Sequence, residues 1–134
     1  MIILEFNLQT GMKAEVEITV EMKDTALAFG SGGVKVLGTP IMIGLMENAS
    51  LKAVDPHLPE GFATVGIDLD VKHIASTPIG MKAYAKAELI KIEGKKLLFK
   101  VEAFDEMEKI GEGLHNRYII ELEKFIKKSE NKGK

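Results

Sequence analysis

The chain has 134 residues, of which 46% are hydrophobic and 28% are charged, so it is expected to form one compact domain with its own core. Its formal net charge of -2 gives no electrostatic basis for nucleic-acid binding, and the absence of cysteine excludes disulfides, thiolate catalysis and cysteine-bound metals. Charged residues interrupt every apolar run before the roughly 20 residues of a membrane span, and no signal peptide is recognisable, so we expect a cytoplasmic protein.

The first predicted elements are strands. Residues 14–20 (AEVEITV) alternate apolar and polar side chains, which is typical of a half-buried strand, and residues 2–7 (IILEFN) are a weaker candidate. The glycine-rich segment 23–38 is expected to begin with a short helical turn at Asp24–Ala26 and to continue as an irregular loop.

A long apolar helix is predicted next, from Thr39 to about Val54. A threonine hydroxyl can accept a free backbone N–H of the first turn, and Pro40 costs nothing at the first helical position, so Thr39-Pro40 is a strong helix start. The prolines and glycine of residues 55–61 (DPHLPEG) end the helix. Few polar side chains interrupt it, so we expect neighbouring structure to wrap it on most sides.

The rest of the chain has the pattern of strands joined by hairpin-short connections. These predict four antiparallel neighbours, at residues 64–75, 81–92, 96–104 and 108–122. One sheet that covers one central helix is an α+β architecture of the hot dog type. Such a sheet leaves strand edges and apolar residues uncovered, which predicts a homodimer and leaves open whether dimers pair into tetramers.

We assign residues 1–126 to a single domain and residues 127–134 (KKSENKGK) to a flexible basic C-terminal tail. No histidine and carboxylate spacing typical of a metal site is present, and the phosphate-binding glycine motifs are absent. We therefore expect neither a metal nor a cofactor.

Glu47 is the first candidate for chemistry. On the predicted helix it shares a ridge with Ile43 and Leu51, so its neighbours are apolar, and a buried carboxylate must find a partner or change its pKa. The simpler alternative is that Glu47, with Asn48 and Lys52, marks a narrow solvated edge of the helix.

The strand at residues 64–75 brings in a second candidate, His73. Regular alternation gives His73 the same strand face as five apolar side chains: Val65, Ile67, Leu69, Val71 and Ala75. If that face packs on the helix, His73 and Glu47 are directed toward one layer, where each could orient the other or a water molecule. A structural, hydrogen-bonded histidine is the alternative.

The last strand contains the run GEGLHNRYII. Gly111 and Gly113 would weaken an ordinary strand, so they indicate close approach of a backbone or a ligand. His115 and Arg117 share their face and form a candidate site for an anionic group such as a phosphate or carboxylate. A partly exposed strand with an ion pair is the alternative.

Three runs of the sequence together resemble the family of hot dog thioesterases similar to fluoroacetyl-CoA thioesterase: TPIMIGLMENASLKAV, the segment from TVGIDLDVKHIASTPIG to VEAFDE, and IGEGLHNRYIIELEKF. The resemblance covers roughly residues 15–126. Its order and spacing are specific, because the Thr/Glu helix, the glycine and histidine strand, the TP.G turn and the G.G.H.R strand occur in sequence.

The resemblance implies a hydrolase of acyl-CoA or acyl-carrier thioesters. Thr39, Glu47 and His73 match the family's active-site threonine, catalytic carboxylate and histidine. Gly66 matches a glycine whose backbone lines the acyl-group site.

Arg117 and His115 match the end of the family motif, which implies a substrate-binding role near the coenzyme A portion. The segment GSGGVKVLG lacks aromatic side chains that would cover a very small acyl group, so the resemblance implies the reaction class and leaves the acyl group open.

Two mechanisms remain open on the sequence. Either Thr39 attacks the thioester with His73 as base, or Glu47 orients a water molecule with Thr39 as a hydrogen-bonding partner. Free backbone N–H groups of the first helical turn are candidate oxyanion donors. The alternative function is a non-catalytic hot dog domain that binds an acyl-CoA or similar anionic ligand.

Overall fold

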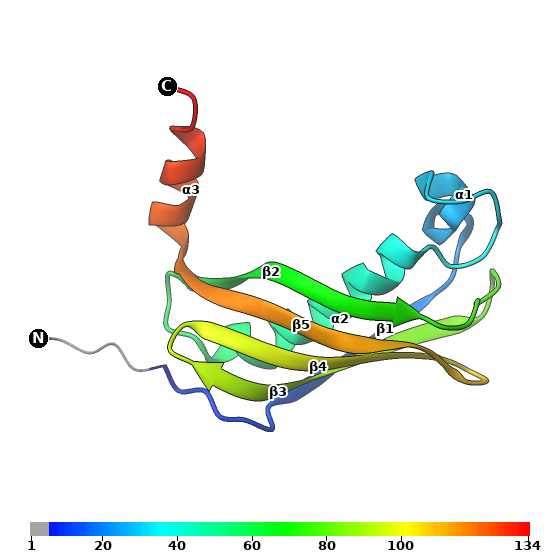
Figure 1. The fold of residues 1–134 in the computed structure, drawn as a ribbon, viewed down its shortest axis with the longest axis horizontal. Helices are drawn as coiled ribbons and strands as arrows, with labels where there is room; N and C mark the ends of the chain where they lie inside the picture. The colour runs from blue at the N-terminus through cyan, green and yellow to red at the C-terminus, as the bar shows by residue number, and fades with distance from the viewer. Residues whose placement is uncertain (1–5) are drawn as a thin grey trace, which may run out of the picture.

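The computed structural model describes residues 6–134 and contains a five-stranded antiparallel sheet curled around one long helix (Figure 1). The strands lie in the order β1-β3-β4-β5-β2, with bounds Lys13–Thr19 (β1), Phe62–His73 (β2), Lys82–Glu93 (β3), Lys96–Asp105 (β4) and Lys109–Glu121 (β5). The predicted α+β hot dog architecture is therefore confirmed. Of the weak strand candidate at residues 2–7, positions 2–5 lie outside the described residues, and Phe6 and Asn7 are not in a strand.

The central helix α2 spans Thr39–Val54, as predicted. Its cap differs from the prediction, because Gly38 is the N-cap residue and no side chain caps the helix. Thr39 is the first helical residue, so its hydroxyl is free for another partner. The shorter helical elements are η1 (Met22–Asp24), α1 (Ala26–Phe29), η2 (Asp55–His57) and α3 (Leu122–Glu130).

The core lies between α2 and the concave face of the sheet. Met42, Met46 and Ala49 of α2 are fully buried there. Small side chains on β3 let the helix approach the sheet closely, while larger ones on β3 and β4 fill the space beside it. The buried strand residues are Ala83, Ala85, Ala87, Leu89, Leu97, Phe99, Val101 and Ala103.

One face of α2 is not covered by its own chain. Ile43, Glu47 and Leu51, the predicted ridge, are each only partly buried, and Gly44 and Asn48 beside them are exposed. The prediction that neighbouring structure covers the helix on most sides is therefore right only for the side that faces the sheet. Uncovered apolar side chains that are contiguous are typical of surfaces at which proteins interact.

Strand β2 contains a β-bulge that changes which side chains face the helix. Its register with β5 shifts between Gly66 and Asp68, so Ile67 is an extra residue and is 49% exposed. A bulge reverses the alternation beyond it. Thr64 and Gly66 therefore face the helix together with His73, although they lie nine and seven positions before it, and such odd offsets put the residues of a regular strand on opposite faces.

This corrects the predicted face of β2. The alternation was expected to put Val65 and Ile67 on the helix side, but the bulge turns both away and turns Gly66 inward. The prediction was right for the part after the bulge, where Val71 packs against the core and His73 reaches the helix.

The two edges of the sheet differ in character. Strand β1 exposes only polar side chains along its length, whereas the edge strand β2 exposes the apolar side chains of Ile67 and Leu69 among charged ones, namely Asp68, Asp70 and Lys72. Charged edges discourage strand pairing and apolar edges favour it.

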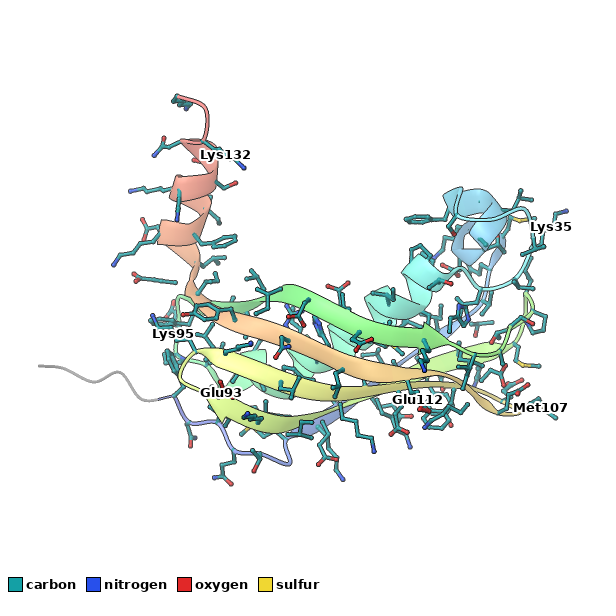
Figure 2. The ribbon with its side chains drawn as sticks, in the orientation of Figure 1. Lys35, Glu93, Lys95, Met107, Glu112 and Lys132 are labelled. Carbon is teal, nitrogen blue, oxygen red and sulfur yellow. The ribbon has the colours of Figure 1, made fainter. Side chains whose placement is uncertain are left out.

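Helix α3 follows β5 and leaves the sheet at one end (Figure 1). It occupies part of the predicted tail, because residues 127–130 are helical. The tip of the helix, near Lys132, lies away from the sheet, and the hairpin at Met107 is at the opposite end of the molecule (Figure 2). None of the helices in the described part of the chain is long and apolar enough to cross a membrane.

Candidate active site

Thr39 and His73 meet at one end of the sheet. Thr39 begins α2, and His73 ends β2 in the part of the strand that follows the bulge and faces the start of the helix. The Thr39 hydroxyl lies 2.7 Å from His73 Nδ1, which is a short hydrogen bond. A hydroxyl held against an imidazole is the arrangement in which a base activates an oxygen nucleophile.

The protonation of His73 suits a base. Burial lowers its pKa below the ordinary value of 6.5, and a polar contact with the backbone of Ala75 offsets part of that effect. The imidazole is therefore neutral near pH 7, and its tautomer sets whether Nδ1 accepts a hydrogen bond from the Thr39 hydroxyl or donates one to it. His73 Nε2 is shielded from solvent and has no hydrogen-bond partner among residues 6–134.

An open hollow of about 330 Å³ lies beside this pair. It is lined by Thr39, His73, Ile74, Ala75 and Ser76. The pair is thus accessible from outside the chain, as a reacting group must be.

Glu47 does not join this pair within the chain. It lies eight residues after Thr39, which corresponds to about 12 Å along the helix axis. Its carboxylate instead faces Gly66 and His115, because a methyl group added at Gly66 would stand 3.1 Å from Glu47 Oε2 and 3.1 Å from His115 Cε1. Gly66 therefore keeps a space open between the carboxylate and the imidazole.

His115 and Arg117 are buried and bonded to each other. His115 Nδ1 lies 2.8 Å from the Asp68 carbonyl oxygen, which can only accept, so Nδ1 carries the proton. His115 Nε2 then accepts from Arg117 Nη1 at 3.1 Å. This fixes the neutral tautomer of His115, and burial, the largest effect, lowers its pKa.

The remaining donors of Arg117 reach Thr64. Its Nε donates to Thr64 Oγ1 at 2.8 Å and its Nη2 to the Thr64 carbonyl at 2.9 Å. Thr64 Oγ1 in turn donates to Asp55 Oδ1 at 2.5 Å, and Thr64 N donates to Asp55 Oδ2 at 3.2 Å. A relay from the end of α2 through β2 to β5 therefore holds the guanidinium in place.

Thr64 and Asp55 are site residues that the sequence reasoning missed. The sequence indicates only that Asp55 belongs to the turn that ends the helix. Regular alternation along β2, without the bulge, assigns Thr64 to the face that points away from the helix. The expected roles of His115 and Arg117 in substrate binding remain predictions. Both are at most 5% exposed, and each already has partners within the chain.

The two glycines of β5 do mark close approaches, as predicted. A side chain at Gly111 would collide with Met42 Sδ of α2 and the Lys72 carbonyl, and one at Gly113 would collide with the backbone of Asp70 and Val71. They allow β2 and α2 to pack directly on β5.

The predicted oxyanion donors are few at the start of α2. Pro40 has no N–H, and the amides of Ile41 and Met42 both bond to the Gly38 carbonyl, each at 3.0 Å. The Thr39 N–H is the remaining first-turn candidate in the described chain, and its role remains a prediction.

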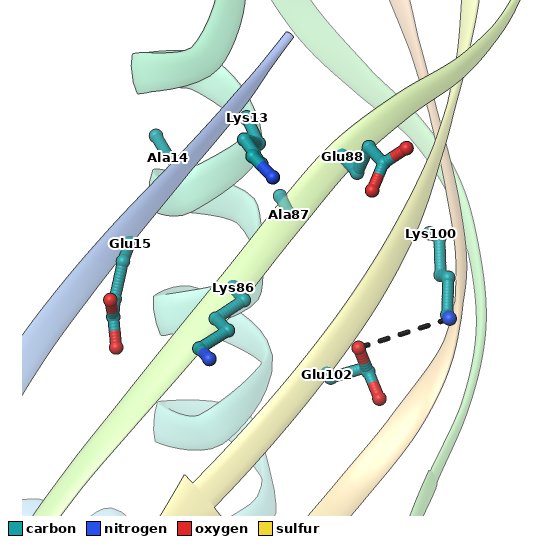
Figure 3. Close-up of a pocket in the computed structure, with 8 residues that line it drawn as sticks. All are labelled: Lys13, Ala14, Glu15, Lys86, Ala87, Glu88, Lys100 and Glu102. Carbon is teal, nitrogen blue, oxygen red and sulfur yellow. Dashed lines mark ion pairs between the residues drawn. The ribbon is translucent and has the colours of Figure 1, made fainter. Parts of the chain in front are cut away.

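A second hollow, of about 400 Å³, lies on the outer face of the sheet, with α2 behind the strands (Figure 3). It is lined by Lys13, Ala14, Glu15, Lys86, Ala87, Glu88, Lys100 and Glu102. Three lysines and three glutamates cancel in charge, and Lys100 and Glu102 lie 3.9 Å apart. The formal charges that line the hollow therefore offer no net attraction for an anionic ligand.

Comparison with known proteins identifies the same family by sequence and by structure. A family model described as fluoroacetyl-CoA-specific thioesterase matches residues 20–123. The fluoroacetyl-CoA thioesterase of Streptantibioticus cattleyicolor is 41% identical over 98 residues, which are 73% of this chain and 70% of that protein.

Two solved structures extend the likeness to the fold. A fluoroacetyl-CoA thioesterase structure superposes with a TM-score of 0.88 at 32% identity, covering 96% of this chain and 99% of the other. A thioesterase superfamily member from Thermus thermophilus superposes with a TM-score of 0.84 at 30% identity, covering 91% and 90% of the two chains.

Proposed function

Because the chain belongs to the fluoroacetyl-CoA-specific thioesterase family, and is therefore a thioester hydrolase of the acyl-CoA thioesterase type, we propose that it cleaves acyl-CoA at a site built by two subunits. Thr39 is the nucleophile and His73 the base. Glu47 of the second subunit accepts a hydrogen bond from His73. The observation that carries this proposal is the unpartnered, shielded His73 Nε2 beside a 2.7 Å bond from Nδ1 to Thr39.

The second subunit pairs through the edge of β2. The segment from Gly66 to Asp70 is exposed and alternates the apolar side chains of Ile67 and Leu69 with the carboxylates of Asp68 and Asp70, of which Asp68 accepts a hydrogen bond from Asn116 of its own chain. Antiparallel pairing of two such edges removes both unpaired strand edges and covers the half-exposed ridge of α2. The proposed assembly is thus a homodimer.

Pairing also shortens the distance between the two clusters. Within one chain, Gly66 and His73 are seven residues apart on β2, or about 23 Å. In a dimer paired about Asp68, the partner's Gly66 lies opposite Asp70, only three residues or about 10 Å along the strand from His73. The partner's Glu47 cluster accordingly comes closer to His73 than the cluster of its own chain.

A carboxylate on His73 Nε2 completes a nucleophile, base and orienting group in the order of known triads. A buried N–H without an acceptor costs about 1–3 kcal/mol, so an acceptor from the second subunit stabilises the dimer as well as the tautomer. His73 then presents Nδ1 to Thr39 without ambiguity.

The chemistry follows from these positions. Thr39 Oγ1 forms a bond to the thioester carbonyl carbon while its proton passes to His73 Nδ1. The carbon–sulfur bond breaks, and the departing coenzyme A thiolate takes that proton. Water next gives a proton to His73 Nδ1 and attacks the acyl-threonine ester, and Thr39 regains the proton as the carboxylic acid leaves.

The space beside Gly66 is the proposed acyl-group subsite. It is bounded by the Glu47 carboxylate and the His115–Arg117 pair, so it is narrow and polar on one side. A related fluoroacetyl-CoA thioesterase has been solved with fluoroacetate and CoA, which supports coenzyme A thioesters of short acids as the substrate class. The cytoplasmic location expected from the sequence also remains a proposal.

The test is an assay of hydrolysis with a panel of short acyl-CoAs, namely acetyl-, fluoroacetyl-, propionyl- and isobutyryl-CoA. Hydrolysis is monitored by measuring the thiol that is released. The chain has no cysteine, so the enzyme adds no thiol to the assay. We expect turnover by the unmodified protein and loss in Thr39→Val and His73→Ala. Ser50→Ala is the control, because Ser50 is buried and bonds only the Met46 carbonyl.

Intact-mass analysis after rapid quenching distinguishes the mechanisms. An acyl adduct that requires Thr39 supports the threonine nucleophile, whereas turnover that survives Thr39→Val assigns the attack to water. Saturable acyl-CoA binding without turnover of any panel member would establish the non-catalytic alternative.

A further inference from the structure

Helix α3 is the most conspicuous part of the molecule that the proposed reaction does not use. It leaves the end of β5 and extends past the β2 edge of the sheet instead of folding back onto it (Figure 1). Its apolar side chains, Leu122, Phe125 and Ile126, are each 45% exposed. They recur at the three- and four-residue spacing of one helix face.

An amphipathic helix with an uncovered apolar face is expected to pack on another surface. Its own sheet is excluded as that surface, because the exposed fractions are measured with the sheet present. The dimer of the proposed function, on which this inference rests, supplies a second copy at the same edge.

The position of α3 relative to β2 determines what it meets in that dimer. The Leu122 amide bonds to the Gly61 carbonyl at 2.9 Å, so α3 begins beside the first residue of β2, Phe62. In a dimer paired about Asp68, the partner's Phe62 lies opposite Ile74. The partner's α3 therefore begins at the His73 end of this chain.

That end carries the matching apolar surface. Ile74 is 52% exposed and directly precedes a bend, and Ile79 is 43% exposed and lies in the turn before β3, where polar side chains are usual. Ile74 also lines the hollow beside Thr39 and His73. Ile74 thus lies next to the reactive pair, and Ile79 is an exposed apolar side chain in the same connection between β2 and β3.

We propose that α3 of each subunit docks on Ile74 and Ile79 of the other and forms one wall of the opening to the other subunit's Thr39–His73 pair. The partner is a second copy of this chain. Each active site then takes its base and nucleophile from one subunit and part of its entrance from the other.

Cross-linking tests this directly, because the natural chain has no cysteine. Two single-cysteine variants, Ile74→Cys and Phe125→Cys, are co-expressed with different affinity tags, and the mixed species is isolated with both tags and treated with a short bismaleimide. Both positions are exposed, so neither substitution disturbs the core. We expect a covalent dimer on a denaturing gel.

The matched control is Ile90→Cys with Phe125→Cys. Ile90 is 40% exposed but lies on β3, toward the end of the sheet from which its own α3 leaves. We expect no covalent dimer from that pair. Equal cross-linking of both pairs overturns the docking. Absence of a cross-link between Ile74→Cys and Phe125→Cys also overturns it, provided that sedimentation shows a dimer and the protein hydrolyses acyl-CoA. Either result leaves the shared active site standing. A monomeric unmodified protein overturns both the docking and the shared site.

Discussion

Two clusters of polar side chains lie along α2, and they are built differently. The Thr39–His73 pair is open to a hollow and leaves one imidazole nitrogen without a hydrogen-bond partner in the described part of the chain. The cluster around Arg117 is buried, and each of the guanidinium's three nitrogens has a partner inside the chain. An unsatisfied, accessible pair is suited to react, whereas a satisfied, buried one is suited to hold a shape.

The largest effect is expected from the open pair. Thr39→Val removes the hydroxyl and keeps the side-chain volume, so activity should fall by about 10²- to 10⁴-fold. Because Gly38 and not Thr39 caps the helix, the free energy of unfolding should change by only about 0.5 kcal/mol or less. Steady-state kinetics and urea denaturation of the same variant check both statements. A large loss of stability would show that the Thr39 hydroxyl has a structural role.

Gly66 lies in the space between Glu47 and His115. Gly66→Ala adds a methyl group 3.1 Å from both neighbours, so we expect activity to fall by about 10- to 100-fold through displacement of reacting groups. Gly33→Ala is the matched control, since a methyl group at Gly33 meets no atom within 4 Å of the described chain and Gly33 has no left-handed backbone conformation. The control should keep full activity. Equal kinetics for the two variants would show that the space beside Gly66 is not used.

The buried cluster should respond mainly in stability. Thr64→Val removes the oxygen that accepts from Arg117 and donates to Asp55, which leaves buried polar groups unpaired. The free energy of unfolding should fall by about 1–3 kcal/mol, while Thr64→Ser, which restores the hydroxyl, should recover most of it. Denaturant titration of both variants measures the difference. Identical stabilities would mean that the relay does not hold Arg117.

The pH dependence gives the smallest effect. Burial within one chain lowers the pKa of His73, whereas the carboxylate that the partner's Glu47 places on Nε2 in the proposed dimer raises it. The pKa of His73, followed by NMR, should therefore be lower in Glu47→Gln than in the unmodified protein. An equal pKa in the two proteins would mean that Glu47 does not contact His73.

Much of the fold could be predicted from the sequence because it depends on local pattern. Thr39-Pro40 marks the start of α2, and short connections between long alternating segments define the strands β2 to β5 to within about two residues. The exception is the β2 bulge. Ile67 continues an apparently regular alternation, and only the pairing with β5 shows that one residue is extra.

The site could be predicted only in part, because the positions of its residues depend on the bulge and on the packing of α2 against the sheet, neither of which a local pattern shows. Thr39 and His73 were expected near each other, and the structure brings them to 2.7 Å. Glu47 was expected in the same layer, but the spacing along α2 separates it from them within the chain. Thr64 could not be found from its residue type, because its role depends on which face of β2 it occupies.

Subunit complementation tests the shared site most directly. His73→Ala and Glu47→Gln subunits, each inactive as homodimers, are refolded together in equal amounts. If one subunit's His73 works with the partner's Glu47, half of the dimers contain one intact site of two, and about one quarter of the unmodified activity should return. If both residues act from the same subunit, every mixed site carries one substitution. Activity that stays at the level of the two separate variants would contradict a site built by two subunits.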